Sequence, residues 1–165
     1  MTSKGVIAIS DVVVNHRTAP KIDSCLNMYT VFEDPDMGNW AVTSNDCGSK
    51  ASSCGCGHAD TGDDVSYAND LDHVDSRVQS AVKDFLNYLK SDVGFQGWRF
   101  DMVKGYGANY VGDYVSSSSP LFSVGEYWDL STTNAFSCAS DCSWVHQMLS
   151  DLKSNTKIKP DPELC

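Results

Sequence analysis

Three short apolar segments separated by helical patterns limit the folds open to this chain of 165 residues. Residues 6–14, 97–101 and 121–128 each carry β-branched, aromatic or other apolar side chains, as in a buried strand. Residues 74–89 and 108–116 carry apolar side chains every three or four positions, which is the spacing of one buried helix face. This alternation predicts an α/β fold with a parallel sheet and right-handed crossovers.

Polar side chains stand at the end of each predicted strand. In parallel α/β sheets, functional groups gather at the carboxyl ends of the strands. We therefore expect a functional site at this edge of the sheet. The strand-end residues are Asp11, Asn15 and His16 on the first strand, Arg99, Asp101 and Lys104 on the second, and Glu126 and Asp129 on the third.

The two carboxylates Asp101 and Glu126 suit glycoside chemistry. Side chains two residues apart share a strand face, so Asp101 lies beside Arg99, and a carboxylate next to a permanent cation stays ionised, as a nucleophile must. Neighbouring strands lie about 4.8 Å apart, close to the carboxyl separation of about 5–5.5 Å in retaining glycosidases. The apolar run around Glu126 favours a protonated general acid. The alternative is a surface salt bridge that closes a strand.

Three further side chains could contact a sugar. His16 could form a hydrogen bond with a hydroxyl group, and Trp128 or Tyr106 could stack on a sugar face. Each has a plainer alternative, which is a structural hydrogen bond for His16 and ordinary core packing for Trp128 and Tyr106.

A long irregular segment separates the first predicted strand from the first predicted helix. Residues 18–72 are dominated by Gly, Asp, Asn, Ser and Cys and are too long for an ordinary connection. We expect an inserted subdomain held by disulfides or by a metal. The amide oxygen of Asn15 and several carboxylates are hard ligands that suit Ca²⁺, although a solvated acidic loop is the alternative. The acidic residues of the insertion considered as ligands are Asp60, Asp63, Asp64, Asp70 and Asp72.

Cysteine usage and charge restrict the surroundings and partners of the chain. Seven cysteines are many for a reducing compartment, and the Cys-x-Cys spacing of residues 54–58 (CGCGH) argues against zinc. The net charge of −10 disfavours nucleic acid, and no apolar run is long enough to span a membrane. Residues 1–4 do not resemble a signal peptide. The localisation is left open, with secretion suspected.

Four segments resemble signature regions of the α-amylase superfamily, in matching order and spacing. Residues 11–16 (DVVVNH), 97–106 (GWRFDMVKGY) and 125–129 (GEYWD) are similar to the first, second and third regions. Residues 70–73 (DLDH) are similar to the short region before the third barrel helix. The resemblance is closest to plant-type and bacterial α-amylases and covers about residues 5–130.

The resemblance implies a partial (β/α)₈ TIM barrel. It assigns residues 1–16 to barrel strand 3, residues 17–72 to an inserted domain B, and residues 73–165 to an incomplete part with strands 4 to 5. The Asn-His-Asp region of the seventh strand, which carries a third catalytic carboxylate, is missing. The helical pattern at residues 144–152 has no counterpart in the resemblance. We therefore expect a fragment that is inactive alone.

The resemblance also implies roles for individual residues. Asp101 would be the nucleophile and Glu126 the general acid and base. The implied substrate contacts are His16, Arg99, Lys104 and Trp128. The implied calcium ligands are Asn15, Asp60, Asp70 and the carbonyl groups of Asp63 and Gly105.

The expected function is endo-hydrolysis of α-1,4-glucosidic bonds in starch or glycogen. The expected partner is therefore an α-glucan polysaccharide or oligosaccharide, and the oligomeric state stays open. One alternative is a catalytically silent carbohydrate-binding or interaction protein built on the amylase scaffold. Another is an α-glucosidase or transglycosylase of the same superfamily.

Overall fold

The computed structural model describes residues 5–127. Its centre is a parallel sheet in the order β1-β6-β7, formed by β1 (Ile9–Val12), β6 (Gly97–Phe100) and β7 (Phe122–Gly125). The register aligns Asp11 with Arg99 and Phe100 with Gly125. The three predicted strands are therefore confirmed, each shorter than its apolar run, and their polar residues gather at one edge.

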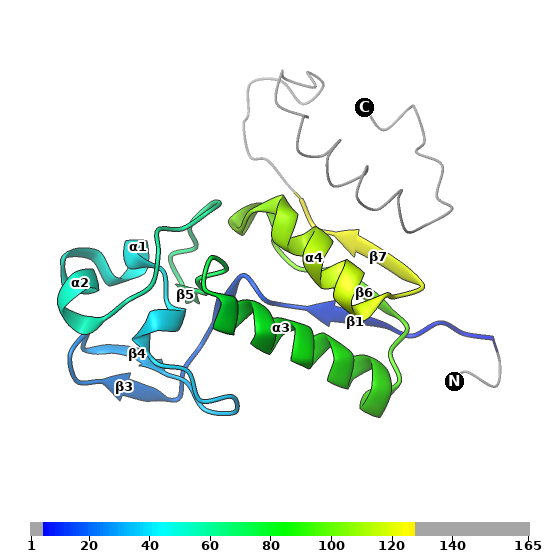
Figure 1. Ribbon diagram of the computed structural model, residues 1–165, viewed down its shortest axis with the longest axis horizontal. Helices are drawn as coiled ribbons and strands as arrows, with labels where there is room; N and C mark the ends of the chain where they lie inside the picture. Colours follow the sequence, from blue (N-terminus) through cyan, green and yellow to red (C-terminus); the bar gives the residue numbers. More distant parts are fainter. Residues whose placement is uncertain (1–4, 128–165) are drawn as a thin grey trace, which may run out of the picture.

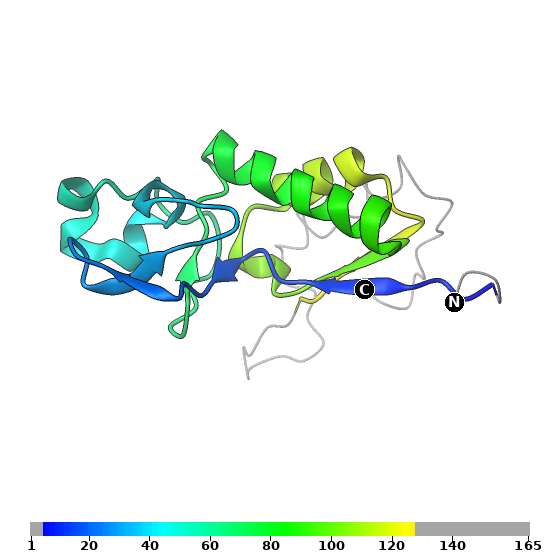
Figure 2. The same ribbon diagram turned by 90° about the horizontal axis from the view of Figure 1, so that it is seen from below.

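Two helices cover one face of this sheet (Figures 1 and 2). Helix α3 (Ser76–Tyr88) continues into a π-helical turn at Leu89–Val93, and α4 (Ala108–Ser118) follows β6. Asp75 caps the start of α3, since its side chain accepts a hydrogen bond from the Arg77 backbone N–H. Both helices were predicted from their apolar periodicity. The helix predicted at residues 144–152 lies outside the described residues.

The core lies between the helices and the sheet because side chains alternate along β6. Trp98 and Phe100 point to the helices and are buried, whereas Arg99 points to the other face. The indole N–H of Trp98 donates to Ser118 Oγ at 2.9 Å, so the polar atom of this large side chain is satisfied inside the core. Val78, Val82 and Leu86 of α3 complete the core.

The insertion forms a separate lobe beside the sheet (Figure 1). It joins the sheet through a short antiparallel pair, β2 (His16–Arg17) and β5 (Asn69–Asp70). Its other elements are β3 (Lys21–Asp23), β4 (Met28–Val31), a 3₁₀ turn at Asn39–Ala41, α1 (Ser44–Cys47), a 3₁₀ turn at Gly48–Lys50 and α2 (Ala51–Cys54).

Two disulfides lie within this lobe. Cys25 pairs with Cys54, and Cys47 pairs with Cys56. These four cysteines therefore have no thiolate for zinc, in agreement with the expectation against a zinc knuckle. The bridges cross-link the short turns of the lobe and restrict its unfolded chain.

The second face of the sheet carries no helix among the described residues (Figure 2). On this face, the side chains of Ile9 and Val13 at the first strand and of Val124 at the third are exposed to solvent. Strands β1 and β7 are also the two edges of the described sheet. Unpaired edges and exposed apolar side chains favour association with further strands or helices. No helix in residues 5–127 is both long enough and apolar enough for a membrane span.

A buried histidine links the start of α3 to the first strand. The distance from His73 Nε2 to the carbonyl oxygen of Val14 is 2.9 Å, and that from His73 Nδ1 to Tyr114 Oη is 2.6 Å. A neutral imidazole satisfies both contacts if Nε2–H donates to Val14 and Nδ1 accepts from Tyr114. Tyr106 stacks on the ring at 4.4 Å between centroids. Burial lowers the pKa of His73 from 6.5 to about 4.

We predict that this histidine makes the fold less stable in acid. Between pH 6.5 and about 4 the unfolded chain protonates His73 while the folded chain does not, so stability is lost as the pH falls through this window. The loss amounts to about 3 kcal/mol. Urea unfolding at both ends of the window should show this slope, and His73→Gln should lack it while being less stable at neutral pH. Equal slopes for both proteins would contradict the prediction.

Candidate functional site

The carboxyl ends of the three parallel strands converge on one guanidinium group. Arg99 Nη1 lies 2.7 Å from Asp11 Oδ1 and 2.8 Å from Asp101 Oδ1, and Arg99 Nη2 lies 2.8 Å from Glu126 Oε1. Asp101 and Glu126, which the sequence selected as a catalytic pair, are therefore both within contact of the same side chain. Asp11 was noted only as a strand-end residue, and its pairing with Arg99 follows from their aligned register.

Backbone hydrogen bonds fix the two carboxylates relative to each other. The Asp101 N–H donates to the Val12 carbonyl at 2.9 Å, and the Glu126 N–H donates to the Phe100 carbonyl at 2.8 Å, which extends the sheet by one residue on each strand. The chain then turns sharply at Met102, whose φ of 45° is left-handed. The Met102 N–H donates to Glu126 Oε2 at 3.3 Å. A rigid strand end is a suitable support for reacting groups.

The site is partly open to solvent, since the side chains of Asp101 and Glu126 are 24% and 34% exposed. The hydrogen bond to Asp11, followed by that to Asp101, raises the pKa of Arg99 further above its ordinary value, so the cation is permanent. The sequence suggested an apolar environment for Glu126. In the structure this carboxylate instead lies against Arg99, because the alternation along β6 turns Arg99 toward the neighbouring strand end.

Two of the other expected substrate contacts, His16 and Lys104, lie among the described residues. His16 is half-buried, and burial lowers its pKa while the nearby Asp101 opposes that shift. Lys104 forms an ion pair with Asp63 of the insertion at 2.8 Å. Trp128 lies outside the described residues. Tyr106 is buried against His73, so the alternative of core packing holds for this side chain.

Three buried oxygen atoms beside β2 and β5 lack hydrogen-bond donors within the described chain. They are Asn15 Oδ1, Asp60 Oδ2 and Asp70 Oδ2. The Asn15 amide N–H donates to the other oxygen of Asp70 at 2.8 Å, so the two side chains share one location although 55 positions separate them. Buried acceptors without donors are unfavourable unless a cation neutralises them. The donor set consists of hard oxygens, which suits Ca²⁺.

Two glycines allow the backbone to approach these oxygens. A Cβ atom on Gly105 would lie 2.0 Å from Asn15 Oδ1, and one on Gly62 would lie 2.4 Å from the carbonyl carbon of Gly105. The loop that follows Asp60 therefore packs directly on the turn after β6. Gly105 was among the predicted ligands, and the structure does bring it against Asn15.

Asp46 and Asp64 extend this acidic cluster. One carboxylate oxygen from each lies within 4.8 Å of the other and of Asp70. Asp46 Oδ2 also accepts the Asp70 N–H at 2.5 Å. Burial, followed by the neighbouring carboxylates of Asp60, Asp46 and Asp64, raises the pKa of Asp70 to about 8. The cluster is thus an accumulation of negative charge that a divalent cation would relieve.

Sequence reasoning selected part of this cluster. Asp64 was considered but not chosen, and Asp46 was missed because it lies in a cysteine-containing turn far from the other acidic residues. The side chain of Asp63 faces Lys104. Asp72 accepts hydrogen bonds from the backbone N–H of His58 and the Val74 N–H, so it anchors the insertion to the start of α3.

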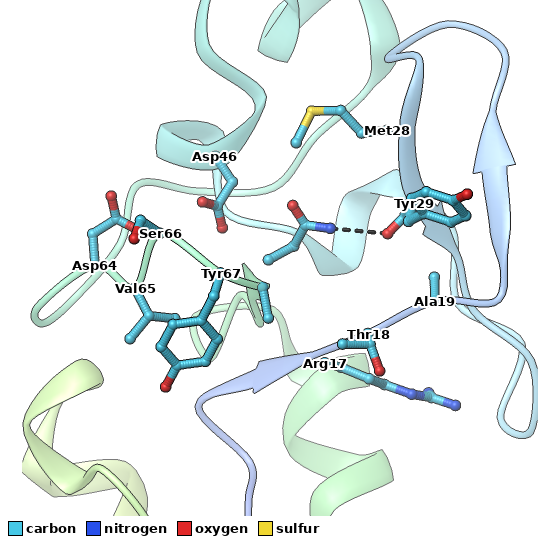
Figure 3. Close-up of a pocket in the computed structure, with 12 residues that line it drawn as sticks. Arg17, Thr18, Ala19, Met28, Tyr29, Asp46, Asp64, Val65, Ser66 and Tyr67 are labelled. Carbon is cyan, nitrogen blue, oxygen red and sulfur yellow. Dashed lines mark hydrogen bonds between the residues drawn. The ribbon is translucent and has the colours of Figure 1, made fainter.

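A cavity of about 720 Å³ opens on the insertion next to Asp46 and Asp64 (Figure 3). Tyr29 and Tyr67 lie on opposite sides of it. The remaining lining residues are Arg17, Thr18, Ala19, Met28, Val65, Ser66, Ala68 and Asn69. Neither the cavity nor Tyr67 was signalled by the sequence.

Curated proteins with similar sequences identify the family of this chain. Probable alpha-amylase 2 of Arabidopsis thaliana is 39% identical over 126 residues, which are 75% of this chain and 29% of that protein. Alpha-amylase 3, chloroplastic, of the same plant is 34% identical over 128 residues, which are 76% of this chain and 14% of that protein. No family model matches the sequence.

Among solved structures, the Group B Streptococcus pullulanase SAP shares the fold. Its TM-score is 0.52 at 19% identity, over 76% of this chain and 14% of that chain. The described residues are a partial α/β unit of the kind found in TIM-barrel proteins of this group. The similarity to the two plant relatives shows the class of protein. The chain belongs to the α-amylase superfamily. It spans less than a third of each of these relatives.

We predict that Arg99 stabilises the strand ends. Arg99→Met would leave three carboxylates facing one another without their shared cation, so the melting temperature should fall most at low ionic strength and recover partly in salt. Lys21→Met is the control, since it removes an exposed ion pair with Glu33 and should have little effect. Thermal melts in low and high salt that show no difference between the two variants would contradict this prediction.

Proposed function

We propose that this chain carries the nucleophile and the general acid and base of a retaining glycoside hydrolase that cleaves internal α-1,4-glucosidic bonds of starch or glycogen. The observation that supports this most directly is the position of Asp101 and Glu126, which end adjacent parallel strands and contact one guanidinium. The superfamily membership of the chain supports the α-glucan substrate.

In the proposed mechanism, a carboxylate oxygen of Asp101 attacks the anomeric carbon. The bond from this carbon to the leaving oxygen breaks as Glu126 gives a proton to that oxygen, a step for which Glu126 must carry the proton in place of its ion pair with Arg99. Glu126 then removes a proton from water, which attacks the same carbon and releases Asp101. The net configuration of the sugar is retained because two displacements occur.

The remaining residues would bind and orient the substrate. Arg99 holds Asp101 in position through the contact of 2.8 Å between Arg99 Nη1 and Asp101 Oδ1. His16 would contact hydroxyl groups of the sugar that is cleaved, and Lys104 and Trp128 would contact neighbouring sugars. A third carboxylate that the superfamily resemblance implies does not occur in this sequence as the expected Asn-His-Asp.

We further propose the domain assignment made from the sequence. Residues 1–16 would be barrel strand 3, residues 17–72 domain B, and residues 73–165 the following part with strands 4 to 5. The order β1-β6-β7 and the single lobe between β1 and α3 support this. A closed barrel has eight strands, and the described residues form three of them.

Calcium is the proposed cofactor. Asn15, Asp60 and Asp70 would hold it with the oxygens that lack donors, and Asp46 and Asp64 add two carboxylates to the same cluster. The ion would supply positive charge between the insertion and the sheet. The carbonyl groups of Asp63 and Gly105 remain proposed ligands. The two disulfides support folding in an oxidising compartment, such as the secretory route.

A catalytically silent sugar-binding protein is the second candidate. The observation that favours it is the cavity on the insertion, which is lined by neither Asp101 nor Glu126. Sugar binding without hydrolysis, in a context that supplies the remaining strands, would support this candidate over the enzyme.

The catalytic prediction is tested by a chimera in which residues 5–127 replace the matching segment of the Arabidopsis protein probable alpha-amylase 2. The chimera should hydrolyse soluble starch, and Asp101→Asn or Glu126→Gln should each lower kcat by about a thousandfold or more. NMR of the first products should show the retained α-anomer. Full activity after either substitution, or an inverted product, would refute the assignment.

The 165-residue chain by itself should hydrolyse starch no faster than buffer does. With three strands in place, the reacting groups lack the rigid surroundings on which transition-state stabilisation depends. Reducing-sugar release measured over hours tests this. Robust hydrolysis that Asp101→Asn abolishes would show that fewer strands suffice.

We also predict that chelator lowers the melting temperature and that Asn15→Ala removes most of this sensitivity. A ligand at a hundredfold excess over its Kd stabilises the fold by about 2.7 kcal/mol, and Asn15 holds one of the three buried oxygens without a donor. Asp36→Asn, an exposed site in the same lobe, is the control and should keep the full response. An unchanged melt of the wild type in chelator would count against the site.

A further inference from the structure

We propose that Tyr67 is a substrate-binding residue whose ring stacks on the glucosyl unit next to the one held at Asp101 and Glu126. The inference rests on the proposed function, since it takes the α-glucan as substrate. Nothing in the sequence resemblance assigns a role to this residue. Its support comes from its exposure, its contacts and its place on the cavity wall.

Tyr67 exposes a large aromatic ring to solvent. It is 71% exposed, the highest value among the large apolar and aromatic side chains of the described residues. Such rings usually bury most of their area because its transfer from water is favourable. An exposed ring at the mouth of a cavity recovers this free energy when a ligand covers it.

The ring is nevertheless held in a defined orientation. It meets the His16 imidazole edge-on, with centroids 5.1 Å apart and planes at 86°. Its hydroxyl group contacts Met102 Sδ at 4.0 Å. These contacts come from the end of the first strand segment and from the turn after β6, so the elements that carry the candidate catalytic groups also orient Tyr67. A preorganised ring loses little freedom on binding.

The distance to His16 defines which sugar the ring would meet. His16 is the proposed contact for the unit that is cleaved. Because the Tyr67 ring meets the His16 ring edge-on and lines the cavity, it suits the adjacent unit of the same glucan chain (Figure 3).

The cavity walls suit a neutral polyhydroxyl ligand. Thr18, Ser66 and Asn69 offer hydroxyl and amide groups, and Asp46 and Asp64 add negative charge that disfavours anions. Asn69 is oriented by donating to the Tyr29 carbonyl at 2.9 Å. Flat C–H faces for an aromatic ring and hydroxyl groups for polar side chains are both features of a glucosyl unit.

The guanidinium of Arg17, the one cation on the described cavity wall, is already engaged. It donates to the carbonyl groups of Glu33, Asp34 and Pro35. It therefore offers little for a phosphate or carboxylate ligand, which leaves a neutral sugar as the class that the wall chemistry fits.

The test is calorimetric titration of the full 165-residue chain with maltoheptaose in saturating calcium. Tyr67→Ala should raise the dissociation constant about tenfold, and Tyr67→Phe should stay within about twofold of the wild type because it keeps the ring. Tyr67→Leu keeps an apolar contact with His16 and Met102 but has no ring face, so it should bind as weakly as Tyr67→Ala. Tyr88→Ala, an exposed tyrosine on α3, is the matched control.

In the chimera described above, Tyr67→Ala should raise KM about tenfold while kcat changes by less than about threefold. A merely structural role would lower kcat and stability as well. Thermal melts identify any variant that has lost its fold, and Tyr67→Phe and Tyr67→Leu then carry the comparison.

The proposal is overturned if the wild-type chain does not bind maltoheptaose, if Tyr67→Ala and Tyr67→Leu bind as tightly as the wild type, or if Tyr67→Phe loses as much affinity as Tyr67→Ala. If binding depends on Tyr67 but Asp101→Asn does not lower the rate of hydrolysis, this inference is supported and the proposed mechanism is refuted.

Discussion

The buried pair of Asn15 and Asp70 is the contact on which the arrangement of this chain depends. Asn15 ends the first strand segment and Asp70 ends the insertion, and their hydrogen bond of 2.8 Å closes a loop of more than fifty residues. It sets the antiparallel register in which His16 faces Asp70. Without this closure, neither His16 nor Tyr67 would have a fixed position relative to the strand ends.

The same pair explains why the junction is chemically unusual. A buried amide and a buried carboxylate satisfy each other on one side and leave one oxygen each without a donor on the other. Further carboxylates from Asp60, Asp46 and Asp64 gather around them rather than basic side chains. Protein interiors rarely retain such an excess of acceptors unless a cation belongs there, and this is the physical basis for proposing calcium.

Periodicity predicted the fold because each strand and helix follows its own apolar pattern. The strand ends predicted most of the candidate site, since parallel strands must bring Arg99, Asp101 and Glu126 to one edge. The sequence predicted that an insertion exists, but the path of the chain inside it could not be predicted in this way. Its path depends on which cysteines pair and on close backbone contacts at Gly62 and Gly105, so Asp46 and Tyr67 reached the site without a local signal in the sequence.

The positions of the disulfides bear on the order in which the chain acquires structure during synthesis. Both bridges close between Cys25 and Cys56, so every sulfur that they need has been synthesised before any residue of β6. The lobe can therefore oxidise as a small cross-linked unit before β6 and β7 join the sheet. A nascent chain that emerges into an oxidising lumen would fold this lobe first and dock the later strands against it.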